Sequence, residues 1–216
     1  MMVLTQIIAR LREVLADSSS LRFSDASLEE GIRQAMQEID TRMPQVIESS
    51  AVLAADGRDQ SLSGLNDPLY LISIRYTGAG ITLDLEPEVQ FSYRMSGGQP
   101  VVHFVGETVP RAGDTLLVTY AACHTLSGLD SASTTSLPDG LQTALVNGAA
   151  GHACLQRVHM LQEKMGAKPG EISQLLQVAK LRLELFQKNL AGQKILQEFG
   201  FPRGFALDQW DHRERI

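Results

Sequence analysis

Hydrophobic positions near the N-terminus recur every three or four residues. Apolar side chains in residues 4–16 fall on one stripe of a helix, and a second stripe follows a serine-rich break. Ser24 and Ser27 are both able to cap the second helix, and Glu30 follows Ser27 at the spacing of a capping box. Pro44 ends the pattern because it lacks a backbone N–H. The pattern therefore predicts two amphipathic helices before this proline.

Beyond this point the hydrophobic period changes from helical to two. Alternating apolar and polar side chains mark residues 68–76, 81–87, 91–95, 100–105 and 114–120. One face of the first strand is predicted to carry Tyr70, Ile72, Ile74 and Tyr76. Gly97 and Gly98 are predicted to form a hairpin turn because glycine tolerates the positive φ angles of tight turns. We expect about six antiparallel strands, joined by short turns.

Helical periodicity returns after a polar segment at residues 127–136, which carries no predicted core residue. Pro138 suits the start of a helix, and Ser136 and Asp139 are predicted to be capping residues. A second helix is predicted over residues 168–190, with its core face formed by Ile172, Leu175, Leu176, Ala179, Leu183, Phe186 and Leu190. The chain is therefore predicted to be an α+β protein. Its expected parts are a four-helix body with two N-terminal and two C-terminal helices (residues 1–44 and 137–199), an inserted antiparallel β-sandwich or barrel-like domain (45–136) and an extended C-terminal docking tail (200–216).

Two glycines interrupt the first of the C-terminal helices. Each costs about 0.5–1 kcal/mol relative to alanine in a helix, which is tolerated where another backbone must come close. Two explanations are open: a tight helix crossing inside the chain, or an interface between subunits. The subunit interpretation places Gly148, Gly151, His152 and Leu155 in the interface.

Aromatic side chains gather in the C-terminal tail, which has neither helical nor strand periodicity. Disordered tails are usually poor in aromatic residues, so we expect this tail to pack against a protein surface. One interpretation is docking on the helical body of the same chain. The other is a partner-binding arm with apolar anchors and a basic rim, formed by Phe201, Arg203, Phe205, Trp210 and Arg213.

The spacing of histidine and cysteine argues against catalysis and metal binding. His152 and Cys154 are two residues apart in a helix and point to different sides. His152 and His159 share a face but are separated by about 10 Å along the axis. His124 follows Cys123 in a strand, where neighbouring side chains face opposite ways. We therefore expect no catalytic residue, no metal site and no cofactor.

Charge narrows the range of partners. The formal net charge is −6, and residues 45–136 hold four basic and ten acidic side chains with no lysine. Such a surface disfavours binding to nucleic acid phosphates. The two cysteines are too few for a disulfide-stapled secreted scaffold, and neither a signal peptide nor a membrane-spanning segment is expected. Synthesis in a reducing cytoplasm is the expectation.

The order of these elements resembles the head-to-tail connector (adaptor) proteins of tailed bacteriophages. The resemblance rests mainly on the helix starts "FSD" at Phe23–Asp25 and "LPD" at Leu137–Asp139, within "RFSDASLEEGIRQAMQEIDTRMP" and "SLPDGLQTALVNGAAGHACLQR". It implies a non-enzymatic ring subunit of the virion neck, made in the host cytoplasm, with a C-terminal segment reaching toward the portal. Implied partners are the portal protein, neighbouring copies in a ring of about twelve, and tail or neck proteins below. DNA would pass through the channel without specific binding, and no membrane is involved.

Two other functions remain open at this stage. One is a tail or baseplate structural subunit, which would not need to bind a portal. The other is an enzyme or small-ligand-binding domain that uses the β domain as a pocket, although no paired base and nucleophile supports it.

Overall fold

The computed structural model describes residues 2–62, 64–77, 90–96, 99–105, 109–163 and 169–200, with side chains of the last helix described as far as Gln193. The chain divides into two compact units. The helical unit is formed by the chain up to Ile39 and from Leu126 onwards, and the β unit is Asp40–Thr125. Two N-terminal helices, an inserted antiparallel β region and two C-terminal helices confirm the predicted α+β class.

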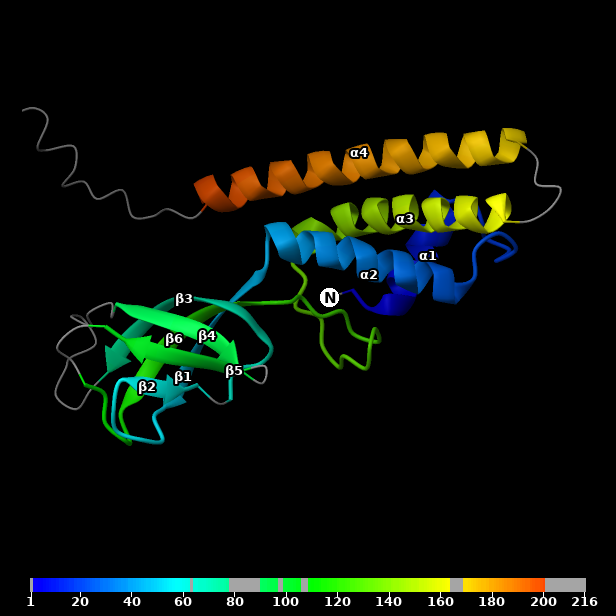
Figure 1. Cartoon of the computed structure of the whole chain (residues 1–216). Coiled ribbons are helices and arrows are strands. Elements are labelled where there is room, and N and C mark those ends of the chain that lie inside the picture. Colours follow the sequence, from blue (N-terminus) through cyan, green and yellow to red (C-terminus); the bar gives the residue numbers. More distant parts are fainter. Residues whose placement is uncertain are drawn as a thin grey trace, which may run out of the picture. The chain divides into compact units, whose positions relative to one another are not determined.

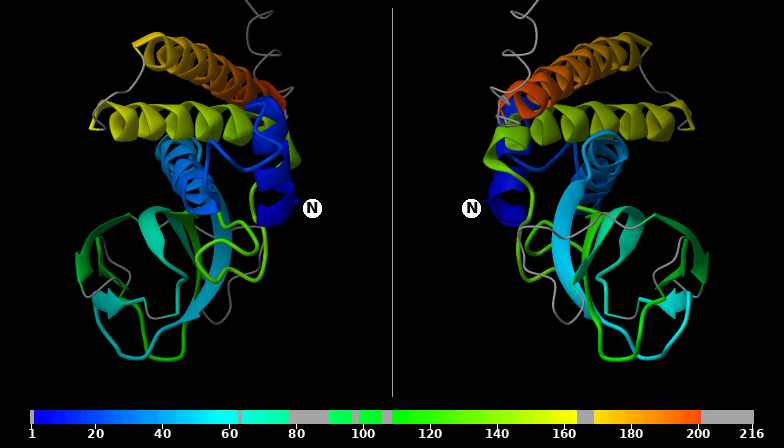
Figure 2. Two further views of the ribbon diagram at one scale, coloured as in Figure 1. Left: turned by 90° about the vertical axis from the view of Figure 1, so that its right-hand side faces the viewer. Right: turned by 90° about the vertical axis from the view of Figure 1, so that its left-hand side faces the viewer.

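Four helices build the helical unit: α1 (Leu4–Val14), α2 (Asp25–Arg42), α3 (Gln142–Gln162) and α4 (Pro169–Gly200). Figures 1 and 2 show α4 running alongside α3 in every view. Their core is apolar and includes Ile7, Leu28, Ala149 and Phe186, none of which is accessible to solvent. No helix within the described residues is long and apolar enough to cross a membrane.

A buried carboxylate organises the connection between α1 and α2. Asp17 is 2% exposed, and its oxygens accept hydrogen bonds from the backbone N–H groups of Leu21, Arg22 and Phe23 at 2.9–3.1 Å. Arg12 lies 3.5 Å from the same carboxylate. Burial acts to raise the pKa of Asp17, but the three backbone hydrogen bonds and Arg12 outweigh it and hold the pKa below 3.8.

Helix starts agree only in part with the predicted caps. Because α2 begins at Asp25, Ser24 is its cap, and its Oγ accepts a hydrogen bond from the backbone N–H of Ser27 at 3.2 Å. The capping role predicted for Asp139 is wrong. A 3₁₀ turn, η2 (Asp139–Leu141), precedes α3, and neither has a side-chain cap. The Asp139 carboxylate instead accepts a hydrogen bond from Gln142 at 2.5 Å.

The polar segment after the β unit packs with the helices, which differs from the predicted boundary at residue 136. Leu129 within the segment is 5% exposed and Leu126 just before it is 1% exposed, so this part of the chain does contribute to the core. The backbone N–H of Leu4 donates to Ser127 O at 3.0 Å. Gly128, at φ +92°, places its backbone so close to α1 that a Cβ there would lie 3.3 Å from the Cβ of Leu4. The helical unit therefore resumes at about residue 126.

The β unit is a small sandwich of two antiparallel three-stranded sheets. One sheet has the order β1-β6-β3, from β1 (Gln45–Val52), β6 (Thr115–Ala122) and β3 (Pro68–Thr77). The other has the order β2-β5-β4, from β2 (Asp59–Ser61), β5 (Gln99–Phe104) and β4 (Phe91–Ser96). Both sheets contribute to one core that includes Ile74, Val118, Val102 and Phe104.

Pairing of β4 with β5 confirms the predicted hairpin, since Ser96 lies opposite Gln99. The glycines between them, and the strand predicted at residues 81–87, lie outside the described residues. The predicted face of β3 is wrong. Irregularities in its pairing with β6 change which side chains face the core, so Leu71 and Ile74 are buried while Ile72 is exposed.

Candidate interaction surface

Close helix crossings in the helical unit depend on glycine. A Cβ at Gly31 of α2 would lie 2.7 Å from the backbone carbonyl oxygen of Ala149 in α3. A Cβ at Gly148 would lie 2.9 Å from the Cβ of Ala35 in α2, and one at Gly151 would lie 2.7 Å from Leu183 Cγ in α4. Gly148 and Gly151 are buried at helix crossings within the chain, and their place in a subunit interface stays a prediction.

His152 lies at the meeting point of three helices. Its Nε2 is 2.9 Å from Glu38 Oε1, and Gln187 donates to the other oxygen of Glu38 at 3.0 Å. Glu38 belongs to α2 and Gln187 to α4, so a single carboxylate links α2, α3 and α4. The side chain of His152 is 15% exposed. Its role in this unit is to hold the helices together, and a contact with a neighbouring copy remains a prediction.

Neither cysteine has the lowered pKa of a reactive thiol. Burial raises the pKa of Cys154 to about 11, so this thiol stays protonated at neutral pH. Burial, with Asp40 nearby, also raises the pKa of Cys123. His124 is paired with Asp40, with its Nδ1 2.7 Å from the carboxylate. Within the described residues, no three His, Cys, Asp or Glu side chains are placed to hold a metal ion.

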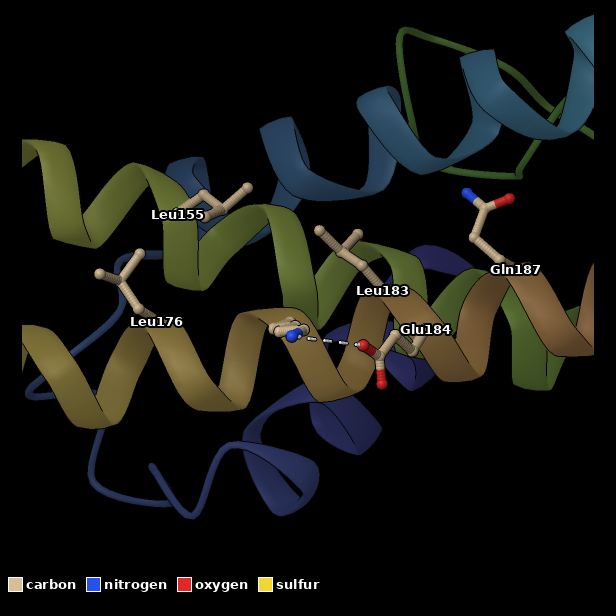
Figure 3. Close-up of a pocket in the computed structure, with 6 residues that line it drawn as sticks. Leu155, Leu176, Leu183, Glu184 and Gln187 are labelled. Atoms are coloured by element: carbon tan, nitrogen blue, oxygen red, sulfur yellow. Dashed lines mark ion pairs between the residues drawn. The ribbon is translucent and has the colours of Figure 1, made fainter.

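A surface groove of about 660 Å³ lies between α3 and α4. In Figure 3, Leu176 and Leu183 point from α4 toward α3, and Leu155 on α3 also lines the groove. Lys180 and Glu184, which are 4.0 Å apart, and Gln187 complete its lining. Of the four residues predicted to lie in a subunit interface, Leu155 thus lines this groove. Sequence analysis placed Leu176 in the core, but it is 42% exposed.

A second apolar line runs along α4 away from the groove. Leu181 is 55% exposed and Val178 is 38% exposed, while Leu185 is partly buried. We call Val178, Leu181 and Leu185 the ridge. Between ridge and core, Arg182 donates to Asn147 Oδ1 at 3.0 Å and to Val14 O at 3.4 Å, fixing α4 to α3 and to the end of α1. α4 therefore presents apolar side chains on sides that its own chain does not cover.

The β unit carries a smaller, polar depression of about 350 Å³. Its lining includes Arg94, Val101 and the pair formed by His103 and Asp59, with His103 Nδ1 2.8 Å from Asp59 Oδ1. Both members of the pair are largely exposed, so the depression lacks the enclosure of a typical ligand pocket.

The five residues predicted to form a partner-binding arm, Phe201, Arg203, Phe205, Trp210 and Arg213, lie outside the described residues. Their assignment to a partner therefore stays a prediction. The groove and the ridge were missed by sequence analysis, although a signal was present. The apolar positions of α4 exceed the single stripe that one buried face requires.

The described helices combine exposed apolar side chains with helix crossings that depend on glycine. The chain belongs to the SU10 adaptor protein family, whose family model matches residues 2–192. This membership confirms the resemblance to the head-tail connector proteins of bacteriophages.

Comparison with solved structures finds similarity to two chains from particle necks. One comes from the neck of an empty GTA particle with C6 symmetry, at 18% identity and a TM-score of 0.29, covering 80% of this chain and 87% of that chain. The other comes from the neck of a native GTA particle with C12 symmetry, at 17% identity and a TM-score of 0.30, covering 80% and 86%. No curated protein matches the chain.

Proposed function

We propose that the chain is a ring subunit of a phage neck that connects the portal to the tail and lines the DNA exit channel. The observation that carries this proposal is membership of the adaptor family over residues 2–192. The role is structural and needs no catalysis. It places the protein in the virion, after synthesis in the host cytoplasm.

Two physical features support this role. A closed ring needs two different surfaces of one subunit to meet, and α4 offers uncovered apolar side chains on more than one side. A channel must also let DNA slide without holding it. The net charge of −6 limits attraction of phosphates, because binding through counterion release requires basic side chains.

The C-terminal tail is proposed to be the arm that binds the portal. Phe201, Phe205 and Trp210 would be apolar anchors, and Arg203 and Arg213 would form a polar rim. The density of aromatic side chains in this segment supports the assignment, because such side chains are unfavourable when left in water.

Truncation after Gly200 tests the arm. The expected result is loss of tailed particles, while the thermal unfolding of the purified protein is unchanged. Replacing Phe201, Phe205 and Trp210 with alanine should reproduce the loss. Replacing Asp208 and Glu214 in the same segment is the matched control and should preserve assembly.

Unimpaired assembly without the segment would refute the portal arm, and a lowered melting temperature would show that the tail docks on its own helical unit instead. If the protein were found in isolated baseplates while the particles lacked tails, the alternative role as a tail or baseplate subunit would be favoured.

A further inference from the structure

The ridge and the groove lie on different flanks of one helix. With 3.6 residues per turn, Leu176 and Leu183 point in nearly the same direction, and the ridge points about 150–180° away from them. The core-facing residues of α4, Leu175, Ala179, Phe186 and Leu190, lie between these two directions and are buried. One flank therefore offers an apolar depression, and the other offers apolar side chains that project from the helix.

The two surfaces also match in length. Leu176 to Leu183 and Val178 to Leu185 both span seven residues, or about 10 Å of helix. Near the groove the charges are balanced, because Lys180 and Glu184 are paired with each other. The lining of the groove therefore carries no net charge, and the two apolar surfaces have the same length along the helix.

We propose that the ridge of one copy packs into the α3–α4 groove of the next copy around the ring. This inference rests on the proposed ring function and adds the surfaces through which the ring closes. Neighbours in a ring of many copies are related by a small rotation, so their α4 helices run nearly parallel and side by side. Because ridge and groove are different surfaces on opposite flanks, the contact continues from copy to copy, as a ring requires. Leu155 then lies in the interface, whereas Gly148 and Gly151 shape it from within the chain.

Two single substitutions test the pairing. Leu181→Asp damages the ridge and keeps the groove, and Leu176→Asp damages the groove and keeps the ridge. Both residues are substantially exposed, so the folded monomer should keep its melting temperature. We expect each variant alone to lose ring assembly and a mixture of the two to form dimers that grow no further, because one intact ridge then meets one intact groove. Gln177→Asp, at an exposed position of the same helix, is the control and should assemble normally.

Cross-linking in assembled particles tests the contact directly. In a Cys123→Ser background, Leu181→Cys with Leu176→Cys should give a ladder of covalent oligomers with a short bifunctional maleimide. The two positions face away from each other on one helix, so a bridge within one chain is excluded. Each single cysteine variant should remain monomeric.

The possible failures are distinguishable. Dimers from Leu181→Cys alone would show that ridges meet each other, which overturns the pairing. A ring in the particle neck that gives no ladder of cross-linked oligomers would also overturn the pairing of ridge and groove. The groove would then be covered by another partner or by the C-terminal segment. The proposed function would still stand. Absence of a ring in the particles would refute the proposed function itself.

Discussion

The Cβ atom that Gly31 lacks would lie 2.7 Å from the carbonyl oxygen of Ala149. A real Cβ atom does not approach a backbone atom this closely, so α2 and α3 cross at a distance that only glycine permits. A backbone atom cannot move aside as a flexible side chain can. The spacing of these two helices therefore depends on a single missing methyl group.

Gly31→Ala should lower the free energy of unfolding by about 1–3 kcal/mol, the usual cost of overpacking. This cost exceeds the 0.5–1 kcal/mol that alanine gains over glycine in a helix. Gly192→Ala, in α4 with nothing within 4 Å of the added Cβ, is the matched control and should stabilise the protein by that smaller amount. Urea unfolding measures both. If Gly31→Ala and Gly192→Ala changed the free energy of unfolding by the same amount in the same direction, the close crossing of α2 and α3 would be contradicted.

Asp17 should make stability depend on pH. Its folded-state pKa lies below 3.8, so its contribution is present above that pH and is lost as the pH falls through the folded-state pKa. At neutral pH, Asp17→Asn should cost about 1–3 kcal/mol, because one of the two oxygens that accept backbone hydrogen bonds is replaced by an NH2 group, which can only donate.

Unfolding free energies measured from pH 7 down to pH 2 check this expectation. The gap between the wild type and Asp17→Asn should narrow only below about pH 4. Asp25→Asn is the control, since Asp25 is 66% exposed in its ion pair with Arg12 and should contribute less than about 1 kcal/mol. A gap that persists unchanged at pH 2 would mean that the charge of Asp17 is irrelevant.

Ala16 ends α1 in an unfavourable backbone conformation. Its φ is +50°, its N–H donates to Glu13 O at 3.1 Å, and the N–H of Asp17 donates to Arg12 O at 2.9 Å, which is the Schellman pattern usually ended by glycine. Ala16→Gly should raise the melting temperature, with a gain of roughly 0.5–1 kcal/mol. Ala9→Gly, at an exposed position inside α1, should lower it by a similar amount. Destabilisation by both substitutions would rule out the strain at Ala16.

The helical unit should survive removal of the β unit if the cut respects the segment after it. Replacing residues 45–124 with a short glycine-serine linker should leave cooperative helical unfolding. Replacing residues 45–136 should cost roughly 3–6 kcal/mol more, because Leu126 and Leu129 each contribute about 1.5–3 kcal/mol by burial. Far-ultraviolet circular dichroism during heating compares the two proteins. Equal melting temperatures would show that residues 125–136 are dispensable.

Local patterns in the sequence predicted most of the fold. The helices were found because a period of three to four residues is a local property, and α2 ends at Arg42 just before Pro44. The buried face of β3 was not predicted, because its pairing irregularities depend on how β6 lies beside it. The pair formed by Glu38 and His152 joins residues 114 positions apart, and no spacing rule brings them together. Leu176 was assigned to the core because periodicity marks apolar positions without showing which are covered.

Electron cryomicroscopy of the neck of purified particles tests the central claim most directly. The account predicts a closed ring of this chain around the DNA channel between portal and tail, in which α4 of each copy lies beside the α3–α4 groove of the next. Particles in which the chain is absent from the neck, or in which its copies do not form a closed ring, would contradict it.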